Sequence, residues 1–80
     1  MLITIGSITT ATRAVKIIEA KTGIKGQVVH TPSEINQGGC SYSIRYSDDY
    51  ENHLRRIVKE NRIPAKKWYR EASGRYDLSR

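Results

Sequence analysis

The first third of the chain shows a short apolar run followed by an amphipathic repeat. Residues 1–6 are rich in isoleucine and stop at a Gly-Ser pair, which predicts a buried first strand. Apolar residues then recur at spacings of three and four between Ile8 and Ile18, a pattern typical of a helix that packs one face on a core. Ser7 is a suitable N-cap for this helix, and Gly23 is a suitable residue to end it.

Two more strands are predicted in the middle of the chain. Residues 27–30 form an apolar segment that ends before Thr31-Pro32, so residues 1–30 predict a βαβ unit, either ordinary or split, with parallel pairing as the default. Residues 40–47 alternate with period two, which is typical of a strand with one face on the core. The expected core face holds Cys40, Tyr42, Ile44 and Tyr46, and the expected polar face holds Ser41, Ser43, Arg45 and Ser47.

A second helix is predicted after residue 47. Asp48 and Glu51 have the spacing of a capping box. The predicted apolar stripe consists of Tyr50, Leu54, Ile57 and Val58. Asn61 is a candidate left-handed terminator, and Pro64 prevents the helix from continuing.

The C-terminal segment is basic and contains aromatic residues. Residues 66–70 have the composition of a strand, and residues 73–75 predict a turn. The elements together predict an α+β fold: a compact βαββα sandwich whose small sheet carries both helices on one face, with an extra C-terminal strand as an option. We expect one domain over residues 1–63 and a basic extension over residues 64–80.

The positive charge is concentrated at one end of the sequence. Residues 1–54 hold five basic and five acidic side chains, whereas residues 55–80 hold nine basic and three acidic ones, which accounts for the whole net charge of +6. Such asymmetry favours an acidic partner, although a solvated basic face is an equal alternative. The cations predicted to dock that partner are Arg55, Arg56, Lys59, Arg62, Lys66, Lys67 and Arg70.

The sequence also bears on the cellular compartment. No apolar run approaches the roughly 20 residues of a membrane span, and residues 1–6 lack the features of a signal peptide, so we expect no membrane association. A single cysteine cannot form an internal disulfide, which fits a reducing compartment. We therefore expect a cytoplasmic protein.

Cys40 offers the clearest opportunity for covalent chemistry. It follows Gly38 and Gly39, which would leave the thiol accessible and allow backbone N–H groups to stabilise an anion. Arg45, or the N-terminal end of a neighbouring helix, would lower the pKa of the thiol. The alternative is an inert cysteine on the core face of its strand, and the residues alone do not separate the two. The histidines and carboxylates lack metal-ligand spacing, so we expect no metal or cofactor.

Several segments resemble small bacterial selenium/sulfur carrier-like proteins. The similar segments are residues 2–7, 14–24, 29–35 and, most strongly, the Gly-Cys-Ser-Tyr-Ser-Ile-Arg-Tyr run of residues 39–46. The resemblance covers about residues 1–63. It departs at Ser41, where the family usually has glycine, and in the basic segment after Pro64, which has no clear counterpart.

The resemblance implies a βαββα domain, like half of a ferredoxin-like fold, in which Cys40 accepts sulfur or selenium and passes it to a partner protein. Cysteine desulfurase-like donors or acceptors are the implied partners, and a carrier is favoured over an enzyme with its own turnover. The rival hypothesis is a small nucleic-acid- or protein-binding module with a structural cysteine. In that module RNA would stack on Tyr42, Tyr46, Trp68 and Tyr69. A partner-binding subunit in which a sheet edge or the basic tail pairs with another copy, as in a homodimer, is a third possibility.

Overall fold

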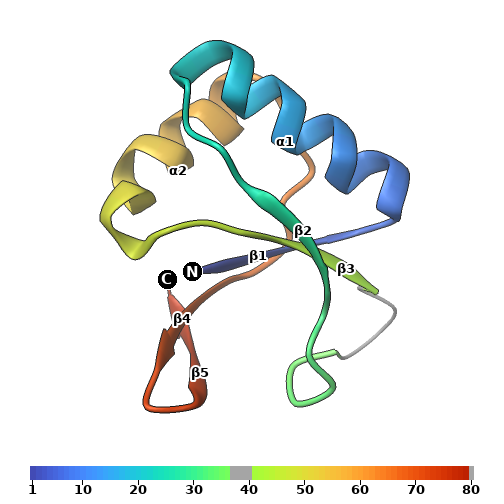
Figure 1. Cartoon of the computed structure of the whole chain (residues 1–80), viewed down its shortest axis with the longest axis vertical. Coiled ribbons are helices and arrows are strands. Elements are labelled where there is room, and N and C mark those ends of the chain that lie inside the picture. Colours follow the sequence, from blue (N-terminus) through green and yellow to red (C-terminus); the bar gives the residue numbers. More distant parts are fainter. Residues whose placement is uncertain (37–40, 80) are drawn as a thin grey trace.

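The computed structural model describes residues 1–36 and 41–79. Its elements are β1 (Leu2–Gly6), α1 (Ile8–Thr22), β2 (Gln27–His30), β3 (Tyr42–Arg45), the 3₁₀ turn η1 (Asp48–Tyr50), α2 (Glu51–Glu60), β4 (Trp68–Ala72) and β5 (Arg75–Ser79). Figure 1 shows the predicted βαββα order followed by a C-terminal hairpin. The α+β class is confirmed.

The strands form one antiparallel sheet in the order β2-β3-β1-β4-β5. Ile44 of β3 pairs with Ile3 of β1 on one side and with Val28 of β2 on the other. β1 and β2 therefore run parallel without touching. The split βαβ unit is confirmed, and the default of direct parallel pairing is wrong. The long connection after β2 lets β3 run back between the two strands, where it forms antiparallel ladders with both, and these are slightly more stable than parallel ones.

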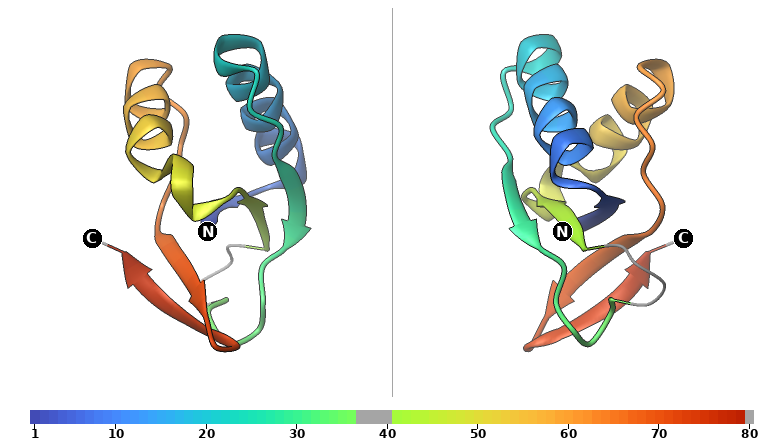
Figure 2. Two further views of the ribbon diagram at one scale, coloured as in Figure 1. Left: turned by 60° about the vertical axis from the view of Figure 1, so that its left-hand side comes forward. Right: turned by 90° about the vertical axis from the view of Figure 1, so that its right-hand side faces the viewer.

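Both helices cover the same face of the sheet, as Figures 1 and 2 show. Ile3, Ile5 and Ile44 reach the core from the sheet, while Ile18 of α1 and Leu54 of α2 meet them from above. These side chains are at most 3% exposed. The predicted helix face on the core is thus confirmed for Ala11, Ala14 and Ile18 of α1, whereas Ile8, the first residue of the predicted repeat, is exposed. Gly23 ends that helix with a left-handed φ of 77°.

Tyr46 shows how closely the connection between α1 and β2 packs on the sheet. A Cβ on Gly26 would overlap the Tyr46 ring, so this position needs a residue without a side chain. Burial, aided by the negative charge of Glu19, raises the pKa of Tyr46 to about 12. The phenol is therefore a neutral part of the core.

The opposite face of the sheet is more buried than its polar sequence predicts. Leu2, Thr4 and Ser43 alternate with the core-facing residues of β1 and β3, yet all three are at most 2% exposed. The hydroxyl groups of Ser43 and Thr31 lie 2.7 Å apart and form a buried hydrogen bond. Ser43 is therefore satisfied inside the protein rather than by solvent.

The start of α2 differs from the predicted capping box. The 3₁₀ turn η1 precedes the helix, and Ser47 caps this turn, because its hydroxyl accepts from the backbone N–H of Asp49. Tyr50 is the N-cap of α2 itself and makes no side-chain capping hydrogen bond. Glu51 is the first residue of α2, and its carboxylate binds side chains of other elements. Tyr50 is 44% exposed, so its place in the apolar stripe is wrong, whereas Leu54 is confirmed as core.

The end of α2 uses a different residue from the one predicted. Arg62, with a φ of 53°, is left-handed, whereas Asn61 is not. The Ile63 N–H donates to the Val58 carbonyl at 3.0 Å, and the Arg62 N–H donates to the Lys59 carbonyl at 3.3 Å. This is a Schellman motif with arginine where glycine is usual.

The basic segment completes the sheet. Trp68 of β4 pairs with Ile3 of β1, so the optional C-terminal strand exists, and β5 adds a second one. Ser73 and Gly74 join β4 to β5 with φ values of 51° and 74°, as a two-residue turn with both central φ angles positive requires. The domain boundary after residue 63 stays a prediction.

Candidate functional site at the end of the sheet

The predicted acceptor residues Gly38, Gly39 and Cys40 lie outside the described residues. Ser41, which is bonded to Cys40, is described and exposed. Its carbonyl oxygen accepts a hydrogen bond from the backbone N–H of Thr31 at 2.9 Å. Ser41 therefore marks where the described chain resumes beside the cysteine.

Ser41 leads into the end of the sheet from which α1 starts. Tyr42 pairs in register with Gly6, the last residue of β1, and with His30, the last residue of β2. The ring centroids of His30 and Tyr42 lie 4.8 Å apart. His30 is exposed at this end, so a polar imidazole stands near the start of β3.

Two sources of positive potential meet at the same end. Ser7 caps α1 by accepting from the Thr10 N–H at 3.1 Å, and the first turn of α1, which the structure describes fully, carries no acidic residue. The positive end of the helix dipole is thus not offset there. The ammonium of Lys66 lies 3.7 Å from the position that a Cβ on Gly6 would occupy. The sheet-end site, as we name it, consists of Gly6, Ser7, His30, Ser41, Tyr42 and Lys66.

Arg45, the predicted electrostatic support for Cys40, lies at the other end of β3. Its guanidinium is ion-paired with Glu71 of β4 at 2.8 Å. Ser41 and Arg45 are separated by the length of the strand, roughly 13 Å at the usual rise per residue. Arg45 is therefore engaged with a carboxylate in the described structure, and its role toward Cys40 stays a prediction.

The seven predicted docking cations fall into two groups. Arg56, Lys59, Arg62, Lys66 and Lys67 are exposed. Arg55 and Arg70 instead converge on the Glu51 carboxylate, with N–O distances of 3.0 and 2.6 Å. The use of all seven cations in docking stays a prediction. For Arg55 and Arg70, an acidic partner would have to compete with the Glu51 carboxylate.

Glu51 is the centre of a small polar network. The Ser79 hydroxyl donates to one carboxylate oxygen at 2.6 Å, and Arg70 Nε donates to the other at 2.8 Å. The Ser79 hydrogen bond and the two arginines lower the pKa of Glu51 from its usual value near 4.5 to about 2. Arg55 also lies over the Trp68 ring, 4.5 Å from its centroid. This network fastens α2 to β4 and β5.

The predicted stacking aromatics are mostly buried. Tyr46, Trp68 and Tyr69 are at most 9% exposed, and Tyr42 packs partly on the core. Base stacking needs an open ring face. Tyr46, Trp68 and Tyr69 therefore do not offer the open ring faces that the RNA hypothesis needs.

Two further properties of the described residues bear on the site. Within residues 1–36 and 41–79, no three histidine, aspartate or glutamate side chains gather closely enough to hold a metal ion. In the same part of the chain, neither helix is long and apolar enough to cross a membrane.

Sequence reasoning did not foresee that Lys66 lies at the sheet-end site. Its neighbours in sequence include other basic residues, so the sequence alone places it in the basic C-terminal segment. The Gly6-Ser7 turn was a possible signal, since a strand-to-helix junction can bind an anion at the helix N-terminus. The approach of Lys66 depends on the pairing of β4 with β1, in which the Lys66 N–H donates to the Thr4 carbonyl at 2.9 Å.

Comparison with known proteins agrees with the resemblance. A family model described as "Putative Se/S carrier protein-like" matches residues 1–70. The match extends past residue 63 and includes the start of β4. No curated protein and no solved structure gave a match. Because this family model covers most of the 80 residues of the chain, the chain belongs to the Se/S carrier-like family.

Proposed function

We propose that this protein is a sulfur or selenium carrier that takes up the atom on Cys40 and hands it to a partner protein in the cytoplasm. One observation supports the proposal above the others: in a Se/S carrier-like chain, the only cysteine of the sequence comes directly before Ser41 and Tyr42, and Tyr42 pairs with Gly6 at the end of β1. The carrier needs no turnover of its own, because the chemistry is exchange between two sulfur sites.

The loading step is a thiolate exchange. The Cys40 thiolate attacks the outer sulfur of a donor persulfide, R–S–SH, and forms Cys40–S–SH. The bond between the two donor sulfurs breaks, and its electron pair leaves with the donor as R–S⁻, so no external oxidant or reductant is needed. Unloading is the same reaction with an acceptor thiolate. A selenium atom would move by the equivalent exchange.

The sheet-end site supplies electrostatic support for such an anion. A thiolate or persulfide near a helix N-terminus or a lysine is stabilised relative to its protonated form. The capped start of α1 and the Lys66 ammonium provide both features beside the strand that follows Cys40. We therefore assign Lys66, in addition to Arg45, as a supporting residue.

Mass spectrometry after loading tests the proposal directly. The protein is incubated with a cysteine desulfurase and cysteine, alkylated and weighed intact. We expect a sulfur adduct that reducing agent removes and that Cys40→Ser abolishes. The proposal fails if no adduct forms with either the desulfurase or inorganic polysulfide, or if the adduct persists in Cys40→Ser.

The proposed electrostatic support of the Cys40 thiolate is tested separately, by the pH dependence of thiol alkylation. We expect an apparent Cys40 pKa below the ordinary value of about 8.5. Lys66→Met should raise this pKa by a few tenths of a unit, because a nearby exposed charge contributes modestly. Lys67→Met is the matched control and should leave the pKa unchanged. An equal effect of both variants would show that only overall charge matters.

A further inference from the structure

We propose that the outward face of α1 is a docking groove for an acidic amphipathic helix of the partner protein. The inference extends the proposed carrier function, because it names the surface that receives the partner. Its test does not involve sulfur transfer, so the two proposals can fail separately.

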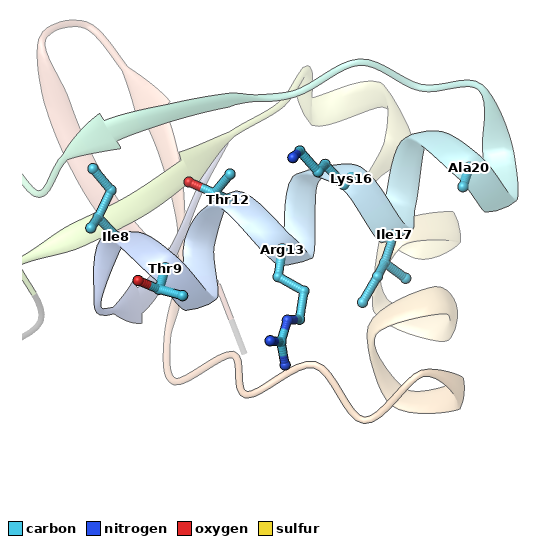
Figure 3. Close-up of a pocket in the computed structure, with 7 residues that line it drawn as sticks. All are labelled: Ile8, Thr9, Thr12, Arg13, Lys16, Ile17 and Ala20. Atoms are coloured by element: carbon cyan, nitrogen blue, oxygen red, sulfur yellow. The ribbon is translucent and has the colours of Figure 1, made fainter.

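The groove consists of two adjoining hollows that share the side chains of Arg13 and Ile17. The first is shallow and runs along α1 from Ile8 to Ala20. The second lies between α1 and the turn after α2, where Arg62 contributes to the wall. Figure 3 shows Arg13 directed toward the chain that follows α2, so its side chain lies where the hollows meet.

Incompletely covered apolar side chains border the groove. Ile8 is 52% exposed, and Ile17 is only partly buried although it packs against the core. At 3.6 residues per turn, the spacing from Ile8 to Ile17 places these two side chains at opposite edges of the exposed face of α1, with Arg13 and Lys16 between them. A partner helix that lies along this face can contact the cations with the middle of its surface and the isoleucines with its flanks.

The middle of the groove is positively charged and lacks internal partners. Arg13, Lys16 and Arg62 line it, whereas neither hollow has a carboxylate in its wall. Among the described residues, none of these three cations takes part in an ion pair. This contrasts with Arg55 and Arg70, which share the carboxylate of Glu51. An acidic strip with an apolar border is the complementary surface.

The groove also leads toward the sheet-end site. Ile8 directly follows the Ser7 cap, and Ser7 follows Gly6, which pairs with Tyr42. A helix lying along α1 would therefore end beside the start of β3. The partly exposed isoleucines at both edges of the groove favour a protein partner over a nucleic acid, because they add apolar contacts to the ionic ones.

Peptide binding to the full chain tests the inference. The probe is a fluorescent synthetic helix with glutamates along the middle of one face and leucines on either side of them. We expect binding that perturbs the NMR methyl signals of Ile8 and Ile17. The triple variant Arg13→Glu, Lys16→Glu, Arg62→Glu should weaken binding at least about tenfold, and Ile8→Ser should weaken it severalfold.

Matched controls distinguish the groove from general electrostatics. Arg56→Glu with Lys59→Glu changes two exposed cations that do not line the groove, and should alter affinity less than about twofold. A peptide with lysine in place of glutamate should not bind. The inference is overturned if the control variant weakens binding as much as the groove variant, if methyl shifts occur elsewhere, or if single-stranded RNA binds the groove and displaces the peptide. Circular dichroism of each variant verifies that the fold is retained.

Discussion

Two sides of this small protein use their cations in opposite ways. On the side of α2, β4 and β5, carboxylates hold the arginines: Glu51 binds Arg55 and Arg70, and Glu71 binds Arg45. On the outward side of α1, the cations line an apolar groove with no carboxylate in its wall. The first set fastens elements of the fold together, and the second is available to a partner.

The difference shows that excess charge in a sequence does not locate a docking surface. The last third of the chain carries all of the net charge, yet part of that charge is used internally. Arg13 and Lys16 belong to the half of the chain without net charge, but they lie beside exposed isoleucine. What distinguishes the two sides is whether each cation has a carboxylate partner in the structure, not how many cations the segment contains.

The largest expected effect is on the carboxylate that defines the first side. Glu51→Gln keeps the shape of the side chain and removes its charge, which leaves two arginines and Ser79 with a weaker acceptor. We expect the free energy of unfolding to fall by about 2 kcal/mol, less than for a fully buried pair because both arginines are partly exposed. Urea denaturation measures this change.

Glu60→Gln is the matched control for that prediction. Glu60 lies on the same helix but is exposed, so the free energy of unfolding should change by less than about 0.5 kcal/mol. A loss of similar size in both variants would mean that the Glu51 network is a surface feature, and the contrast between the two sides would disappear.

The pH dependence of stability follows from the same network. The pKa of Glu51 is about 2 in the folded protein and near 4.3 in an unfolded chain. Between these values the unfolded state binds more protons, so stability falls as the solution becomes more acidic. The contribution of Glu51 should be fully present above about pH 4.5 and should decline as the pH falls toward about 2. In urea titrations, Glu51→Gln should lose less stability over this range than the unchanged protein.

The sequence predicts the local elements well because their signals are local. The apolar repeat from Ile8 to Ile18 and the Ser7 and Gly23 caps lie within one helix, so the structure of α1 follows from neighbours in the chain. The alternation in residues 40–47 likewise identifies β3 and places Ile44 and Tyr46 in the core. These interpretations need no knowledge of the sheet order.

The sequence predicts a wrong interaction where a residue has two suitable partners. Glu51 has the sequence spacing of a capping residue, but it also lies four residues before Arg55 and, in space, beside Arg70 and Ser79. Charged partners in a partly buried setting stabilise a carboxylate more than one helix N–H does. The pairing with β4 and β5 decides the outcome, and no local pattern reveals it.

The candidate site was predicted only in part for the same reason. Cys40 stands out because it is the only cysteine, and a helix N-terminus was considered as its support. Two features of the sheet-end site, the start of α1 near Tyr42 and the approach of Lys66 to Gly6, depend on β3 and β4 flanking β1 in the sheet. The groove on α1 was not predicted, because the sequence does not show which apolar residues remain uncovered.

A smaller effect is expected for the second ion pair on the α2, β4 and β5 side. The Arg45 and Glu71 side chains are 42% and 34% exposed, so solvent screens their interaction. Glu71→Gln should lower the free energy of unfolding by about 0.5 kcal/mol. A double-mutant cycle with Arg45→Met in urea denaturation isolates the coupling. A coupling above about 2 kcal/mol would place this pair in the class of the Glu51 network.

The smallest expected change in stability concerns the groove. Arg62 has a left-handed backbone, which costs a residue with a Cβ about 1 kcal/mol, whereas glycine loses about 0.5–1 kcal/mol through the greater freedom of the unfolded chain. Arg62→Gly should therefore leave the free energy of unfolding within about 0.5 kcal/mol of its original value, or raise it slightly.

The same variant should nevertheless weaken binding of the acidic helix, because it removes one of the three cations that line the groove. Stability and binding are measured on one sample, by urea denaturation and by fluorescence anisotropy. Unchanged stability with weaker binding would show that the Arg62 guanidinium serves a partner rather than the fold. A loss of stability above about 1 kcal/mol with unchanged binding would instead place Arg62 among the structural cations, together with Arg55 and Arg70.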